Sequence, residues 1–137
     1  MNISLRAGEK IYINGAVLRV DRKVSISLLN DAHFLLEAHV LQAADATTPM
    51  RQLYFLLQLM LMEPGGAIEA KRLFEVFHSQ MSLVLGNTIL VDGLGEVGDL
   101  VKDSRYFEAL KVIRALYPLE AKLQAAPASA ASPVKAA

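Results

Sequence analysis

The sequence predicts an α+β fold in which a small N-terminal antiparallel β-sheet, a meander of about 4–5 strands, precedes a C-terminal bundle of about four helices. In the first third, Val24, Ile26 and Leu28 alternate with serines, which is the period of a strand with one buried face. Further along, apolar residues recur every three or four positions, which is the period of a helix. We therefore expect a β subdomain over 1–45 and a helical subdomain over 46–124.

The composition is that of one packed globular protein. Hydrophobic residues make up 53% and charged residues 20% of the 137 residues, and 14 basic side chains balance 14 acidic ones. A nucleic-acid surface must then be a local patch. Because the chain has no cysteine, disulfides, thiolate metal sites and a cysteine nucleophile are excluded. We expect no metal and no cofactor.

The ends of the chain carry further expectations. The first ten residues lack the basic-then-apolar order of a signal peptide, and the longest nearly apolar run, 53–62, is far shorter than the ~20 residues that span a bilayer. We therefore expect a cytoplasmic protein without a membrane partner. Residues 125–137 are mostly alanine, proline and serine, a composition that cannot form a core, so we expect a disordered tail.

A β-hairpin is predicted at Asn14-Gly15, because both residues accept the positive φ of a type I′ turn. A two-residue loop places Lys10 opposite Arg19 and alternates the side chains between two faces. The expected core face is Ile11, Ile13, Ala16, Leu18 and Val20. The expected open face is Lys10, Tyr12, Val17 and Arg19.

Four helices are predicted after residue 47. Thr48 is an N-cap candidate with Pro49 in the first turn, and the helix over 50–62 is apolar on nearly every side. Such a helix is either central in the fold or covered by a partner. The other helices are expected over 67–85, 86–102 and 105–117, and Pro118 closes the last one, or bends it if the helix continues to Leu123.

A G-x-G-x-x-G sequence at 93–98 matches a dinucleotide-binding pattern, but its context does not. Too few residues follow it for a second parallel strand, and three carboxylates would lie beside the phosphates. The apolar residues around it recur at helical spacing, so we interpret the segment as a helix. Its buried stripe is expected to be Leu90, Leu94, Val97 and Val101.

The histidines do not indicate a catalytic or metal site. His33, Glu37 and His39 fall on one side of a strand if residues 33–40 are extended, but no fourth ligand is indicated. His78 is expected to be solvent-exposed on a helix. No nucleophile–base pair, carboxylate cleft or phosphate loop can be argued, so we do not expect an enzyme.

The basic residues indicate a candidate RNA-binding surface near the N-terminus. Five of them, against three acidic residues, lie in the first 31 positions. Like charges opposite one another on a hairpin are destabilising unless an anion such as phosphate screens them, and an aromatic ring on the same face could stack on bases. The candidate residues are Lys10, Tyr12, Arg19, Arg22 and Lys23, with Arg51 as a secondary candidate. The alternative is an ordinary hydrated sheet edge.

Three stretches together resemble the family of the flagellum biosynthesis repressor FlbT. They are Ile3 to Val17 (ISLRAGEKIYINGAV), Thr48 to Phe55 (TPMRQLYF) and Tyr106 to Lys111 (YFEALK). The resemblance implies a small cytoplasmic post-transcriptional repressor that associates with the 5′ untranslated region of flagellin mRNA and promotes its degradation. It also implies action alongside the partner regulator FlaF. No catalytic residue and no DNA binding is implied.

A second hypothesis is a protein-interaction module, or chaperone-like factor, that binds flagellin or the FlaF-type regulator through the helical half. It is motivated by the apolar helix over 50–62, since Met-rich apolar surfaces adapt to partner helices. The alternative is that this helix is simply the core. The sequence leaves open whether the protein is a homo-oligomer.

Overall fold

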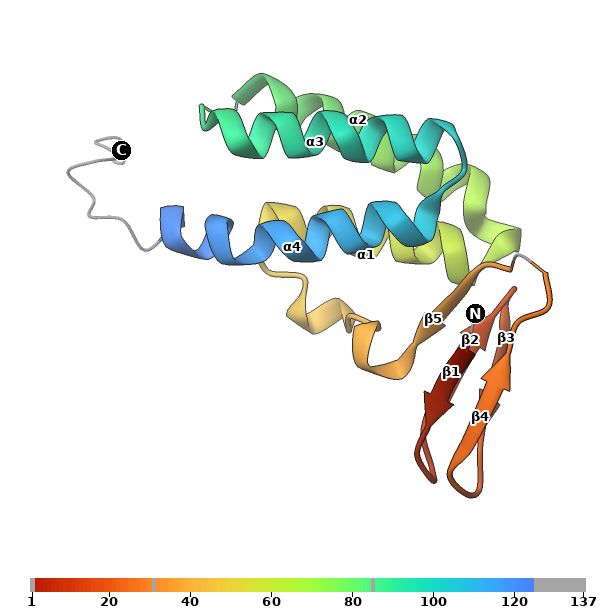
Figure 1. The fold of residues 1–137 in the computed structure, drawn as a ribbon. Helices are drawn as coiled ribbons and strands as arrows, with labels where there is room; N and C mark the ends of the chain where they lie inside the picture. The colour runs from red at the N-terminus through yellow and green to blue at the C-terminus, as the bar shows by residue number, and fades with distance from the viewer. Residues whose placement is uncertain (1, 31, 85, 125–137) are drawn as a thin grey trace.

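The computed structural model describes residues 2–30, 32–84 and 86–124, so the predicted tail over 125–137 lies outside the described residues. Five short strands form a β layer at one side of four helices (Figure 1). The strands are β1 (Asn2–Leu5), β2 (Lys10–Ile13), β3 (Ala16–Arg19), β4 (Val24–Ser27) and β5 (Phe34–Leu36). Sheet followed by helices confirms the predicted α+β class.

The strands pair in two small antiparallel sheets, with orders β1-β4 and β3-β2-β5. The connections therefore differ from the expected meander, because β1 pairs with β4 and β2 with β5. The predicted hairpin register is confirmed, with Lys10 opposite Arg19. Asn14 and Gly15 have φ of 48° and 86°, as a type I′ turn requires.

Each face of the three-stranded sheet meets a different neighbour. Ile11 and Phe34 join Ile3 and Leu5 in a small cluster shared with the β1-β4 sheet. On the opposite face, Leu35 is fully buried in the helical core. One sheet thus has a core on both sides, which alternation along a single strand did not reveal.

The expected core face is only partly buried. Ile11 is fully buried, and Val20 packs against the small cluster, but Ala16 and Leu18 are exposed. The reason is that they lie on β3, an edge strand whose four residues are all exposed. Edge position, rather than alternation, decides their burial.

The helices follow the predicted order. They are α1 (Pro49–Met62), α2 (Ala67–Val84), α3 (Thr88–Lys102) and α4 (Tyr106–Gln124), with 3-10 turns η1 (Glu37–His39), η2 (Ala43–Asp45) and η3 (Pro64–Gly66). The Thr48 side chain accepts a hydrogen bond from the backbone N–H of Arg51 at 3.2 Å, which confirms the N-cap. Helix α4 continues through Pro118 rather than closing there.

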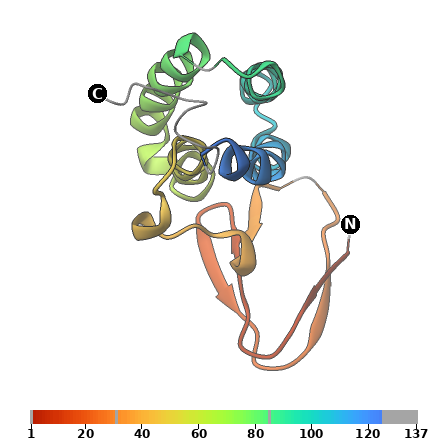
Figure 2. The ribbon, with the colours of Figure 1, turned by 90° about the vertical axis from the view of Figure 1, so that its left-hand side faces the viewer.

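Helix α1 is the central element of the bundle. It packs against both α2 and α4, while α3 packs mainly against α4 (Figure 2). Its side chains Leu53, Tyr54 and Leu57 are at most 1% exposed. The apolar helix therefore supplies much of the core, while its side chains Phe55, Leu56, Leu59 and Met62 are only partly buried. No helix in the described part of the chain is long and apolar enough to cross a membrane.

The glycine-rich segment is helical, as predicted, and its stripe Leu90, Leu94, Val97 and Val101 is buried. A Cβ at Gly98 would lie 3.1 Å from the His78 ring, so this glycine permits close contact between α3 and α2. His78 is half-buried rather than solvent-exposed. Its Nε2 donates a hydrogen bond to the Leu94 carbonyl at 2.6 Å, and its ring stacks on Phe74.

Candidate nucleic-acid interface

Most of the predicted RNA-binding residues gather where two turns meet at the end of the β layer that is remote from the helices (Figure 1). The backbone N–H of Gly8 donates to the Val20 carbonyl at 2.7 Å, and the Val20 N–H donates to the Glu9 carbonyl at 3.1 Å. These bonds hold the β1–β2 turn against the β3–β4 turn. We call the basic residues of this region the basic tip: Arg6, Lys10, Arg19, Arg22 and Lys23.

Two of the five cations of the basic tip are paired. The Arg6 guanidinium lies 3.4 Å from the Glu9 carboxylate, and the Arg22 guanidinium lies 3.3 Å from the Asp21 carboxylate. Ion pairs at the surface contribute little to stability. The Glu9 carboxylate also accepts the backbone N–H of Arg6, and this bond is the main reason that its pKa is lowered. Glu9 is therefore a charged member of the region at neutral pH.

The other three cations leave the basic tip with a positive excess. The side chains of Lys10, Arg19 and Lys23 form no ion pair with any residue that the structure describes. Arg19 and Lys23 are exposed, and Lys10 is half-exposed and lies directly opposite Arg19. Like charges held opposite one another attract an anion, and phosphate is the anion that nucleic acids supply.

Tyr12 does not share this open position. It lies opposite Leu35 in the β2–β5 pair, and both side chains pack on the helical core, Leu35 fully and Tyr12 in part. The face that carries Lys10 and Tyr12 is thus half covered: the helices lie over Tyr12, and the strand ends extend beyond them. The Tyr12 ring is thus partly covered by the helical core, and its stacking on RNA bases stays a prediction.

Arg51 is also separate from the basic tip. It lies in the first turn of α1, at the opposite end of the bundle in Figure 1, and its guanidinium lies 4.4 Å from the centroid of the Tyr117 ring. A cation in this position is stabilised by the ring quadrupole. Through this contact, Arg51 links α1 to α4.

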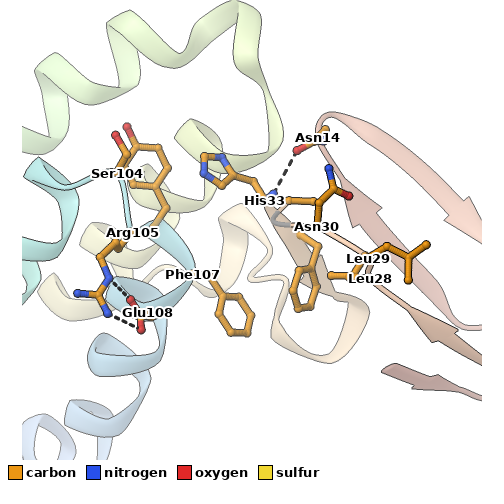
Figure 3. A pocket seen from close by; sticks show the side chains of 12 residues that line it. Asn14, Leu28, Leu29, Asn30, His33, Ser104, Arg105, Phe107 and Glu108 are labelled. Carbon is orange, nitrogen blue, oxygen red and sulfur yellow. Dashed lines mark hydrogen bonds and ion pairs between the residues drawn. The ribbon is translucent and has the colours of Figure 1, made fainter. Parts of the chain in front are cut away.

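A hollow that the sequence did not indicate lies between the β layer and the start of α4 (Figure 3). It has a volume of about 790 Å³ and is bordered by amide, aromatic and charged side chains. The rings of His33 and Tyr106 lie 5.4 Å apart, and the Asn14 side chain accepts the backbone N–H of His33. Arg105, the cation at this hollow, is paired with Glu108.

Comparison with known protein families shows to which family the chain belongs. A family model described as "Flagellar protein FlbT" matches residues 1–124. The chain belongs to the FlbT family. The match confirms the resemblance carried by the three stretches, and it spans the basic tip together with all four helices.

Curated members of the FlbT family are similar over most of their length. A protein of Bradyrhizobium diazoefficiens, named probable flagellum biosynthesis repressor protein FlbT 2, is 58% identical over 120 residues, 88% of each chain. Proteins named probable flagellum biosynthesis repressor protein FlbT are 52% identical in Chelativorans sp. (90% of this chain, 86% of the relative) and 54% identical in Brucella abortus (92% and 83%). No solved structure matches.

The candidate metal residues of this FlbT member are not arranged along one strand. Strand β5 ends at Leu36, and Glu37 and His39 belong to the 3-10 turn η1. Glu37 instead accepts the backbone N–H of Lys10 at 2.8 Å, while His39 is half-buried and its pKa is lowered, mainly by burial and then by Arg114. In the described ranges no group of three or more His, Cys, Asp or Glu could hold a metal ion.

Proposed function

We propose that this FlbT family member is a cytoplasmic, non-catalytic repressor of flagellin synthesis. It binds the 5′ untranslated leader of flagellin mRNA through the basic tip and promotes degradation by exposing the RNA to a cellular nuclease. The names of the relatives support the repressor role, and the positive excess at the basic tip supports the RNA contact. The tip is the single structural observation that carries the proposal.

Electrostatics makes the contact modest on its own. The protein has a formal net charge of zero, so attraction is confined to a few side chains. Each phosphate contact with single-stranded RNA contributes about −0.7 to the slope of log K against log salt, which limits five cations to roughly −3.5. A second regulator of the FlaF type would then act by adding contacts to the same complex.

The test is a gel shift with the flagellin leader at several salt concentrations. The double variant Lys10→Glu plus Arg19→Glu reverses two charges at the basic tip, and we expect a loss of affinity on the order of tenfold or more and a shallower salt slope. Lys71→Glu plus Lys111→Glu is the matched control, because both lysines are exposed on helices outside the tip. Equal binding by the two double variants would refute the tip as the RNA surface.

The second hypothesis, binding of flagellin or FlaF through the helix over 50–62, has less support. The methionines Met50 and Met60 are at most 3% exposed, so they are not a free adaptable surface. The partly exposed apolar residues of α1 are Phe55, Leu56, Leu59 and Met62. A pull-down of FlaF or flagellin that is abolished by Phe55→Ala but retained by the basic-tip variant would favour this hypothesis over RNA binding.

A further inference from the structure

The outer surface of α2 exposes large apolar side chains that do not pack in the core of the helical bundle. Leu73, Val76 and Leu83 are 45%, 50% and 85% exposed. In Figure 2, α2 (green) lies at the edge of the bundle, on the other side of α1 from α4. Folding of a single chain therefore leaves this surface in contact with water.

These residues form a continuous line with a defined spacing. Leu73, Val76, Gln80 and Leu83 follow one another at intervals of three, four and three, the heptad spacing of helix–helix seams. We call these four residues the α2 seam. The opposite stripe of α2, which includes Ala70, Phe74 and Met81, is buried in the protein's own core, so the seam is additional to that core.

A groove runs beside the α2 seam and widens the apolar surface. It has a volume of about 360 Å³ and lies between α2 and α1. Phe55 and Leu56 of α1 line its other wall, with Gln52 at the border. A helix that packs on the seam thus gains contacts from a second helix, as in a helical bundle.

The α2 seam is complementary to itself in reverse. Its 3-4-3 spacing is unchanged when read backwards, so a two-fold axis beside residue 78 brings Leu73 against the partner's Leu83. The same axis brings Val76 against the partner's Gln80. An isologous interface needs this kind of self-complementarity, in which residue i meets j and j meets i.

Charge selects the antiparallel orientation. The charged residues of α2 all lie in its first half, at Glu69, Lys71, Arg72 and Glu75, and none lies between Val76 and Val84. A parallel arrangement would place Glu69 beside the partner's Glu69. The antiparallel arrangement keeps these two carboxylates apart and also opposes the two helix dipoles.

We propose that the protein is a symmetric homodimer in which the α2 seams of two copies pack antiparallel. An 18-residue helix is about 27 Å long. A specific interface buries at least about 500 Å² per partner, so the dimer needs the flanking α1 groove as well as the seam. The dimer carries two basic tips. The dimer proposal does not depend on whether these tips bind RNA.

Molar mass in solution tests the dimer directly. Wild-type protein, measured by sedimentation equilibrium from low micromolar to several hundred micromolar, should show a dimer. Val76→Glu places a carboxylate in the seam and should weaken dimerisation by at least a hundredfold. Val17→Glu is the matched control, because Val17 is also an exposed valine, 59% exposed on β3, and this variant should remain dimeric. Circular dichroism checks that both variants stay folded.

Cysteine crosslinking tests the orientation without background, because the chain has no cysteine. The double variant Leu73→Cys plus Leu83→Cys should form a covalent dimer on mild oxidation, and Leu73→Cys alone should not. Crosslinking of the single variant would refute the antiparallel arrangement. The homodimer would be refuted if the wild-type protein stayed monomeric at all concentrations. It would also be refuted if Leu73→Cys formed a disulfide with a different protein in cells.

Discussion

The side-chain carboxylate of Glu120, near the end of α4, accepts a hydrogen bond from the backbone N–H of Met50 at the start of α1, at 2.9 Å. The first N–H groups of a helix have no partner within it, and a negative charge at this end also complements the helix dipole. Glu120 is only 6% exposed. The last helix thus fixes the beginning of the central helix across 70 positions of sequence.

Removing this carboxylate should destabilise the protein. Glu120→Ala leaves the buried Met50 N–H without its acceptor, so we expect the free energy of unfolding to fall by about 1–3 kcal/mol in urea denaturation. Glu108→Ala is the control, because Glu108 is exposed and its ion pair with Arg105 lies at the surface; its change should stay within about 0.5 kcal/mol. Similar losses in the two variants would contradict the special position of Glu120.

Two tyrosines with buried hydroxyl groups, Tyr54 and Tyr117, should respond differently to loss of the hydroxyl group. The Tyr54 hydroxyl donates to the His39 carbonyl at 2.5 Å and accepts from Arg114 at 2.9 Å. The buried Tyr117 hydroxyl has no hydrogen-bond partner among the described residues. Tyr54→Phe should therefore cost about 1–3 kcal/mol of stability, whereas Tyr117→Phe should be neutral or stabilising.

Chemical denaturation of both variants, followed by circular dichroism, separates these outcomes. Burial raises the pKa of both phenols, so both are neutral at pH 7 and the comparison concerns hydrogen bonding rather than charge. Tyr117→Phe also retains the ring under the Arg51 guanidinium. A large loss of stability in Tyr117→Phe would contradict the absence of a hydrogen-bond partner for this hydroxyl among the described residues.

Two of the three glycines of α3, Gly95 and Gly98, should differ in how well they tolerate a side chain. A Cβ at Gly95 meets nothing within 4 Å, so Gly95→Ala should raise stability by about 0.5–1 kcal/mol through helix propensity. A Cβ at Gly98 meets the His78 ring, which is held by its bond to the Leu94 carbonyl and cannot easily withdraw. Gly98→Ala should therefore lower the melting temperature, and the reverse order would refute the close contact.

Stability should fall at mildly acidic pH through His39. Burial, followed by the nearby Arg114 charge, lowers the pKa of His39 below its ordinary value of 6.5. The unfolded chain then binds this proton more readily than the folded one. The stabilising contribution is complete above pH 6.5 and is lost as the pH falls through the lowered value. Urea midpoints of wild type should decline from pH 7.5 to 5.5 more than those of His39→Gln, and parallel declines would contradict this assignment.

Local features of the chain were predictable because neighbouring residues decide them. Asn14 and Gly15 tolerate positive φ, so the turn and the register of Lys10 against Arg19 followed from a few residues. Thr48 marks the start of α1 by capping it. Helical period likewise predicted the buried stripe of α3, including Leu94, even though its glycines resemble a nucleotide-binding loop.

The candidate site was predictable only in part. The end of β3 with Arg19, and the following turn with Arg22 and Lys23, could be placed from sequence, and they lie against the β1–β2 turn at one end of the β layer. The positions of Tyr12 and Arg51 could not be placed, because each depends on a residue distant in sequence. Leu35 brings the Tyr12 face against the helices, and Tyr117 holds Arg51 at the far end of the bundle.

The sequence by itself determined the secondary structure, the hairpin register and the membership of a family, since period, turn chemistry and similarity are properties of the order of residues. Only the tertiary structure decided which sheet face the helices cover, that α1 supplies much of the core, and that α2 has a free apolar side. These outcomes depend on pairings such as β2 with β5 and contacts such as Glu120 with Met50. Such contacts join segments far apart in the chain, and local preferences alone do not decide which distant segments will meet.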